Sequence, residues 1–164
     1  MPTFDAQGQP LKLFNDILPA EYPEDRAYID IINKIKPYTL TISEGLEPTY
    51  ALFQAVRYIV QNNIPGDMVE CGVWRGGSMM LIAYALQYFG DTTRQLYLYD
   101  TYAGMTEPDD IDVDLNGIPT KPLWNKTVSE GAKMGYGGTI EHVRANLRLT
   151  GYSEQQMHFI AGDV

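Results

Sequence analysis

The segment from Glu70 to Ser78 constrains the fold of this chain more than any other, and it reads Glu-Cys-Gly-Val-Trp-Arg-Gly-Gly-Ser. It overlaps a short apolar run, 68–72, and leads into residues 78–89, which are apolar on nearly every side. A short apolar run is typical of a buried parallel strand, and a helix without a polar face lies between other elements. The segment therefore predicts a strand that turns through glycines into a buried helix.

The turn itself is typical of a small-molecule site, because Gly72, Gly76 and Gly77 fall within it. Glycine allows a ligand to approach the backbone, and the first N–H groups of a helix have no partner inside the helix. The helix dipole favours a carboxylate or phosphate at that end. The G-x-x-x-G-G spacing is neither the G-x-G-x-x-G of dinucleotide-binding proteins nor a Walker loop. A generic tight turn remains the alternative for the glycines taken alone.

An acid ends the next predicted strand, Gln95–Asp100. A carboxylate at the end of the second strand of such a unit can accept both hydrogen bonds of a ribose diol. The alternative is that Asp100 caps a turn or a helix.

The remaining chain alternates predicted helices and loops around these strands. Residues 102–138, rich in glycine and proline, are expected to form one long loop that acts as a lid or binding loop. The other predicted segments are an extended arm over residues 1–23, helices over 24–36, 46–62 and 139–149, and a third strand over 157–161. We expect an α/β fold with three parallel strands in the order 3-2-1. Residues 1–63 would form an N-terminal arm with helices, and residues 64–164 the first half of a Rossmann-like domain.

Two longer stretches, Ile64–Met80 and Leu96–Met105, resemble the macrocin O-methyltransferase family of class I S-adenosylmethionine-dependent methyltransferases. The terminal Phe159–Val164 is similar to the family's segment after its third strand, and the resemblance spans about residues 38–164. It implies a Rossmann-like class I methyltransferase fold, truncated after the third parallel strand, with N-terminal helices in front. It also implies methyl transfer from S-adenosylmethionine to a hydroxyl of a sugar or other natural product, with a small molecule as acceptor. The alternatives are a non-catalytic cofactor-binding or interaction module, or a fragment that needs a partner for activity.

The resemblance also implies where the cofactor binds. The acid region would face the methionine amino group, the glycines would pass under the methionine and ribose, and the segment after the third strand would lie near the adenine. The implied cofactor-binding residues are Glu70, Gly72, Gly76, Gly77, Ser78, Asp100, Thr101, Gly162 and Asp163. Trp74 and Arg75 would either border the cofactor or pack against the long loop. Family members need a divalent ion, usually Mg²⁺, held near the ends of a fourth and a fifth strand; this sequence contains neither, so no metal ligand is assigned.

Three other features of the sequence are candidates for a functional or structural role. His142, on the helix after the long loop, is a candidate catalytic base, although a lone helical histidine is more often at the surface or in a core. Cys71 is expected to be buried and to serve packing. Within the acidic run Asp110–Gly117, the residues from Asp112 onward fit the first half of a twelve-residue calcium loop, but Leu123 occupies the last position, where that loop needs an acid. A solvated acidic lid is the preferred interpretation of this run.

Composition limits the partners and the compartment. Twelve basic against twenty-one acidic residues give a formal charge of -9, which disfavours nucleic acid and anionic membranes as partners. The single cysteine allows no internal disulfide and agrees with a cytoplasmic location. No signal peptide and no membrane-spanning run is apparent. Because no fourth strand would cover the first strand, its apolar edge predicts homo-oligomerisation or association with another polypeptide.

Overall fold

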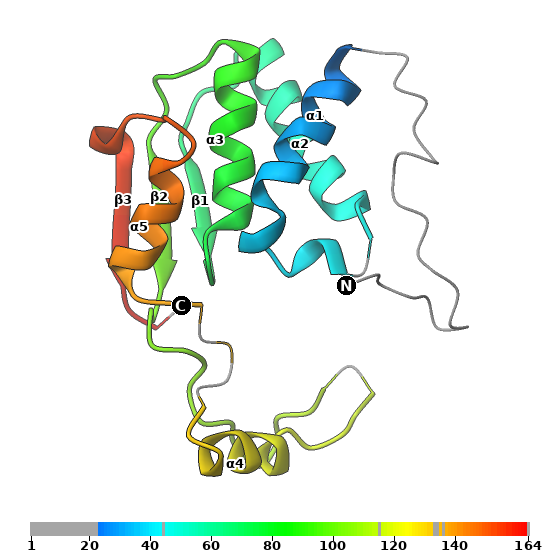
Figure 1. The fold of residues 1–164 in the computed structure, drawn as a ribbon, viewed down its shortest axis with the longest axis vertical. Helices are drawn as coiled ribbons and strands as arrows, with labels where there is room; N and C mark the ends of the chain where they lie inside the picture. The colour runs from blue at the N-terminus through cyan, green and yellow to red at the C-terminus, as the bar shows by residue number, and fades with distance from the viewer. Residues whose placement is uncertain (1–22, 44, 115, 133–134, 136, 164) are drawn as a thin grey trace.

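The computed structural model describes residues 23–43, 45–114, 116–132, 135 and 137–163, so the predicted arm over residues 1–23 lies almost wholly outside the described part. Its central feature is a small parallel sheet with helices on one face (Figure 1). The elements are the helices α1 (Pro23–Ile35), α2 (Glu47–Gln61), α3 (Gly77–Phe89), α4 (Lys121–Ser129) and α5 (Ile140–Arg148), the strands β1 (Met68–Cys71), β2 (Leu96–Asp100) and β3 (Met157–Ala161), and the 3-10 turns η2 (Lys36–Tyr38), η3 (Thr41–Ser43) and η4 (Glu154–Gln156).

The three strands are parallel, with β2 in the centre, which confirms the predicted 3-2-1 order. Within the described residues β1 pairs with β2 alone. Glu70 of β1 lies opposite Leu98, which in turn lies opposite Phe159 of β3. Since parallel strands all end at the same side of a sheet, the carboxyl ends of β1, β2 and β3 converge. The glycine turn leaves β1 at that end.

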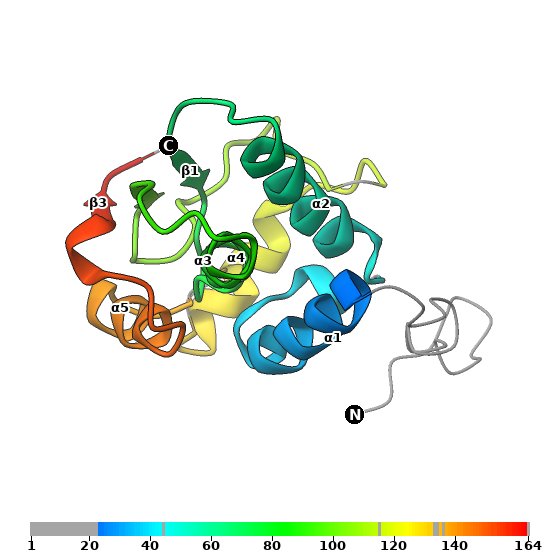
Figure 2. The same ribbon diagram turned by 90° about the horizontal axis from the view of Figure 1, so that it is seen from above.

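Helix α3 is the centre of the hydrophobic core, as its uniformly apolar sequence predicts. Met79, Leu81 and Leu86 are fully buried, and α1, α2 and α5 all contact this helix. The hydroxyl of Tyr28 in α1 donates to the Leu46 carbonyl at 3.0 Å and thereby ties α1 to the start of α2. Seen from above, α3 and α5 lie on the same side of the strands (Figure 2).

The opposite face of the sheet is open in the described part of the chain. Val69 is 60% exposed, and Cys71 is exposed as well. The prediction that Cys71 is buried was therefore wrong. Side chains alternate between the two faces of a strand, and Met68 and Glu70 take the face toward the helices. Cys71 consequently points to the face that no described helix covers.

The prediction of one long loop over residues 102–138 was wrong in part, because this segment contains helix α4. Pro122 stands in the first turn, where its fixed φ suits a helix start, and the Trp124 N–H donates to the Thr120 carbonyl at 3.0 Å. Helix α4 buries none of its side chains. It lies away from the sheet (Figure 1), so its apolar residues Leu123 and Val128 stay exposed instead of joining the core.

Among the described residues, no helix combines the length and the apolar character that a membrane crossing requires.

Candidate functional site

The turn between β1 and α3 has an unusual backbone. Gly72 and Gly76 have φ values of +83° and +87°, which glycine adopts without steric cost. Trp74, between them, has φ +50°. This conformation costs a non-glycine residue about 1–2 kcal/mol, and such strain concentrates at functional sites.

Asp100 holds this turn in place from the end of β2. Its Oδ2 accepts the N–H groups of Val73 at 2.6 Å and Trp74 at 3.0 Å, and its Oδ1 accepts the Tyr102 N–H at 2.8 Å. The carboxylate thus acts as a turn cap, the alternative that the sequence left open. A carboxylate has about four acceptor positions, so the ribose contact of Asp100 stays a prediction.

Glu70 is the chemically most unusual side chain of the turn. Its Oε2 atom is buried and has no hydrogen-bond partner among the described residues. Burial raises the pKa of this carboxyl to about 7, although the Ser78 hydroxyl and the Met79 backbone N–H act in the opposite direction. A buried acceptor without a partner is costly. Glu70 is therefore set up to receive a cationic donor.

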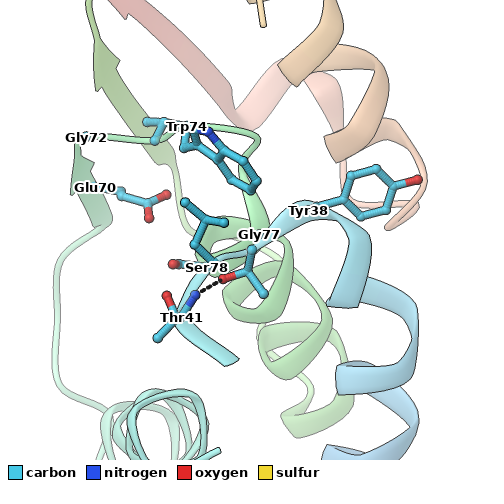
Figure 3. A pocket seen from close by; sticks show the side chains of 10 residues that line it. Tyr38, Thr41, Glu70, Gly72, Trp74, Gly77 and Ser78 are labelled. Atoms are coloured by element: carbon cyan, nitrogen blue, oxygen red, sulfur yellow. Dashed lines mark hydrogen bonds between the residues drawn. The ribbon is translucent and has the colours of Figure 1, made fainter. Parts of the chain in front are cut away.

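A cavity of about 110 Å³ lies beside Glu70 at the start of α3 (Figure 3). Its lining residues are Tyr38, Thr39, Leu40, Thr41, Glu70, Gly72, Val73, Trp74, Gly77 and Ser78. Four predicted cofactor residues meet here: Glu70, Gly72, Gly77 and Ser78. Sequence reasoning missed the wall formed by Tyr38–Thr41, and its only signal was two threonines between the N-terminal helices.

The other predicted cofactor residues lie outside this cavity lining. Gly76 caps α3 beneath α5, where a Cβ atom would meet Leu147 Cδ2 at 2.7 Å. Thr101 donates its hydroxyl to the Gly104 carbonyl at 2.7 Å. The Gly162 N–H donates to the Asp100 carbonyl at 3.0 Å, and Asp163 is exposed. Their contacts with a cofactor stay predictions.

Trp74 packs against the long loop, as one of its two hypotheses predicts, and a contact with the cofactor stays a prediction. It lines the cavity, and its backbone lies so close to Gly137 of the long loop that a Cβ atom at Gly137 would clash. Arg75 stacks over the Trp74 ring at 4.6 Å from the ring centroid. Its carbonyl accepts the Asn146 side-chain amide of α5 at 3.0 Å. The turn is therefore braced on the side of α5 and the loop.

His142 takes part in a capping box at the start of α5. Its Nδ1 accepts the Thr139 N–H at 3.3 Å, and its own N–H donates to the Thr139 hydroxyl at 3.4 Å. The ring lone pair is thus engaged in this conformation. A base role for His142 would require that bond to open, and it stays a prediction.

The acidic run before α4 makes local contacts. Asp114 Oδ1 accepts the N–H groups of Asn116 and Ile118, and Asp110 pairs with Lys121 at 3.0 Å. In the described part of the chain, no three His, Cys, Asp or Glu side chains group in a way that could hold a metal ion.

A parallel α/β sheet with a glycine turn after an acid-bearing first strand defines a class I methyltransferase-like fold. The solved structure of the O-methyltransferase NovP has this fold: it superposes with a TM-score of 0.57 at 25% sequence identity, covering 76% of this chain and 47% of NovP. Residues 37–163 match the family model of macrocin O-methyltransferase (TylF), and the chain belongs to this family.

Two curated relatives are O-methyltransferases of natural products. The first is 8-demethyl-8-(2,3-dimethoxy-alpha-L-rhamnosyl)-tetracenomycin-C 4'-O-methyltransferase of Streptomyces olivaceus, which is 32% identical. The second is demethyldecarbamoylnovobiocin O-methyltransferase of Streptomyces niveus, which is 30% identical. Each match covers 72% of this chain and 42% of the relative. The chain thus spans less than half the length of these relatives.

Proposed function

We propose that this chain is the cofactor-binding portion of an S-adenosylmethionine-dependent O-methyltransferase. Its acceptor would be a hydroxyl on a sugar or another small natural-product metabolite, as the names of the curated relatives suggest. The observation that carries the proposal is the buried, unpartnered Oε2 of Glu70 in a cavity at the start of α3. An α-amino-acid group bears the ammonium that such an oxygen lacks.

The residues of the turn fit the two charges of that group. Glu70 would accept the ammonium, and the first N–H groups of α3, other than the Met79 N–H that already acts on Glu70, would face the carboxylate. The sulfonium of the bound cofactor supplies an electrophilic methyl group. Methyl transfer to a hydroxyl is an in-line displacement, so positioning contributes much of the acceleration. The braced turn of Val73 and Trp74 would provide this positioning by fixing where the cofactor lies.

Activation of the acceptor hydroxyl is the less defined half of the proposal. A base or a metal ion would lower the pKa of that hydroxyl, and Mg²⁺ is the ion that the family resemblance implies. The described residues offer no group of three potential metal ligands. His142 is the candidate base.

Association and location complete the proposal. We infer that the open sheet face, on which Val69 is 60% exposed, associates with a second copy or another polypeptide. A cytoplasmic location is favoured by the single, exposed Cys71, because a free thiol persists in a reducing compartment.

Calorimetry with S-adenosylhomocysteine tests the proposal. Saturable binding in the micromolar range at pH 8 is expected, and the absence of any binding heat would contradict cofactor recognition. A non-catalytic binding module is the second candidate, since the chain spans less than half of its relatives. A methyl-transfer assay with added Mg²⁺ and hydroxylated glycosides separates the two: a module would bind the cofactor and transfer nothing.

A further inference from the structure

The backbone of Tyr38 and Thr39 lies directly against the first residue of α3. A Cβ atom at Gly77 would stand 2.5 Å from the Tyr38 carbonyl oxygen and 2.5 Å from Thr39 Cβ. Gly77 does not have a positive φ, so no unusual backbone conformation requires glycine there. Glycine at position 77 instead makes room for the segment between η2 and η3. The structure thus joins a piece of chain that precedes α2 to the glycine turn that follows β1.

This segment brings two hydroxyl groups to the cavity. Thr39 and Thr41 line it together with Ser78 and Glu70, and the Tyr38 ring points away from Glu70 (Figure 3). Thr39 Oγ1 accepts the Thr41 N–H at 3.2 Å. Because that oxygen lone pair is used, the Thr39 hydroxyl hydrogen is directed elsewhere and remains available as a donor.

The charges of the residues that line the cavity limit which ligand groups these hydroxyls can bind. Glu70 is the one ionisable acid among the residues that line the cavity, and the lining includes no Lys, Arg or His. A ligand carboxylate placed here would therefore rely on hydroxyl and N–H donors instead of a cation. The cavity, at about 110 Å³, is well below the roughly 300–1,000 Å³ of sites that enclose a whole drug-sized ligand. It suits one polar end of a larger molecule.

We propose that Thr39 and Thr41 form a hydroxyl wall that recognises the carboxylate of an α-amino-acid group whose ammonium pairs with Glu70. Gly77 is then required to admit this wall. The inference rests on the proposed function, because the α-amino-acid group is that of S-adenosylmethionine. It adds the segment before α2 to the site and gives Gly77 a different role from that of contacting the cofactor.

Two ligands that differ in this group test the wall. S-adenosylhomocysteine carries the α-amino-acid group, whereas 5'-methylthioadenosine keeps the adenosine and the thioether but lacks it. Thr41→Val removes one hydroxyl at nearly constant shape, and Thr39→Val removes the other together with the acceptor of the Thr41 N–H. A hydrogen bond to a charged group is worth about 1.5–3 kcal/mol, so each variant should raise the Kd for S-adenosylhomocysteine roughly tenfold or more. The Kd for 5'-methylthioadenosine should stay within about twofold of wild type.

Two control variants separate the hydroxyl from the fold. Thr41→Ser keeps the hydroxyl and should retain wild-type affinity. Thr92→Val removes an exposed threonine hydroxyl in the loop before β2, at the opposite end of the sheet, and should change neither Kd. Thermal midpoints equal to that of wild type would verify that all four variants are folded.

The outcomes distinguish failure of the hydroxyl wall from failure of the proposed function. If wild type binds S-adenosylhomocysteine and both valine variants bind it equally well, the wall is refuted while the proposed function stands. Equal weakening for both ligands would also refute it, because a general packing effect would then explain the loss. If wild type binds neither ligand, the proposed function fails and the wall fails with it.

Discussion

Asp100 Oδ2 accepts the backbone N–H of Trp74 at 3.0 Å and thereby ties the end of β2 to the one non-glycine residue of positive φ in the turn after β1. The same oxygen accepts the Val73 N–H at 2.6 Å. Since β1 and β2 are neighbours in the sheet, strand pairing and turn geometry support each other. The shape of the candidate site therefore depends on a residue that does not line its cavity.

Replacing Asp100 should disturb both the fold and the site. Asp100→Ala leaves the N–H groups of Val73, Trp74 and Tyr102 without their acceptor, and each unsatisfied buried group costs about 1–3 kcal/mol. We expect a loss of at least about 2 kcal/mol in the free energy of unfolding, measured by urea titration, and a Kd for S-adenosylhomocysteine at least about tenfold higher. Asp110→Asn, an exposed acid outside the turn, is the control and should change little. Unchanged stability and affinity in Asp100→Ala would show that the hydrogen bonds of Asp100 to the turn are dispensable.

The ionised Glu70 carboxylate should lower the free energy of unfolding, although it is the form that would bind the cofactor's ammonium. Burial raises the pKa of this carboxyl from 4.5 to about 7, so between these values the folded chain binds more protons than the unfolded chain. The contribution of Glu70 to the free energy of unfolding consequently falls as the pH rises from about 4.5 to 7. Glu70→Gln removes the ionisation and should be more stable than wild type at pH 8 by about 1–3 kcal/mol. The difference should shrink at pH 5.5, and an equal difference at both pH values in urea titrations would contradict the assignment.

Alanine substitutions at Gly77 and at Gly90 together test whether Gly77 makes room for the hydroxyl wall. Gly77→Ala places a methyl group 2.5 Å from the Tyr38 carbonyl, so the wall must move and affinity for S-adenosylhomocysteine should fall at least about fivefold. Gly90→Ala, at φ +85° with nothing within 4 Å of the added Cβ, carries only the backbone cost of about 1–2 kcal/mol. Calorimetry should find its affinity unchanged. Equal losses in both variants would mean that the effect arises from general destabilisation.

The open sheet face should drive association. Val69 is 60% exposed on β1, so residues 1–164 alone should form oligomers in size-exclusion chromatography with light scattering. Val69→Lys places a charge on that face and should shift the population toward the monomer. The control Tyr58→Lys changes an exposed apolar residue on α2 and should leave the population of oligomers unchanged. A wild-type chain that is a stable monomer would contradict the association.

The reach of sequence reasoning follows from how local each signal is. The glycine turn and α3 were predictable, because the apolar run and the glycines are contiguous in the chain. Helix α4 was not, since it is short, lies within a segment rich in glycine and proline, and buries no side chain. The wall at Tyr38–Thr41 depends on a contact with Gly77, far along the chain, that spacing cannot reveal. The domain division at residue 63 stays a prediction.

The two possible roles of Asp100 also show a limit of sequence reasoning. A carboxylate at the end of β2 suits a ribose diol and a turn cap equally well, and only the positions of the Val73 and Trp74 N–H groups distinguish what it holds in this structure. Similarly, Cys71 was predicted to be buried because it lies in the first strand, whereas the described helices cover only one face of that strand.

The pH dependence of S-adenosylhomocysteine binding tests the central claim most directly. With the pKa of Glu70 at about 7, the carboxylate is about one tenth ionised at pH 6 and about nine tenths ionised at pH 8. Calorimetry should therefore give a Kd about tenfold lower at pH 8 than at pH 6 in wild type, and a weaker, nearly pH-independent Kd in Glu70→Gln. Binding that is absent at pH 8, or equally strong at both pH values and in both proteins, would contradict the claim that Glu70 recognises the cofactor.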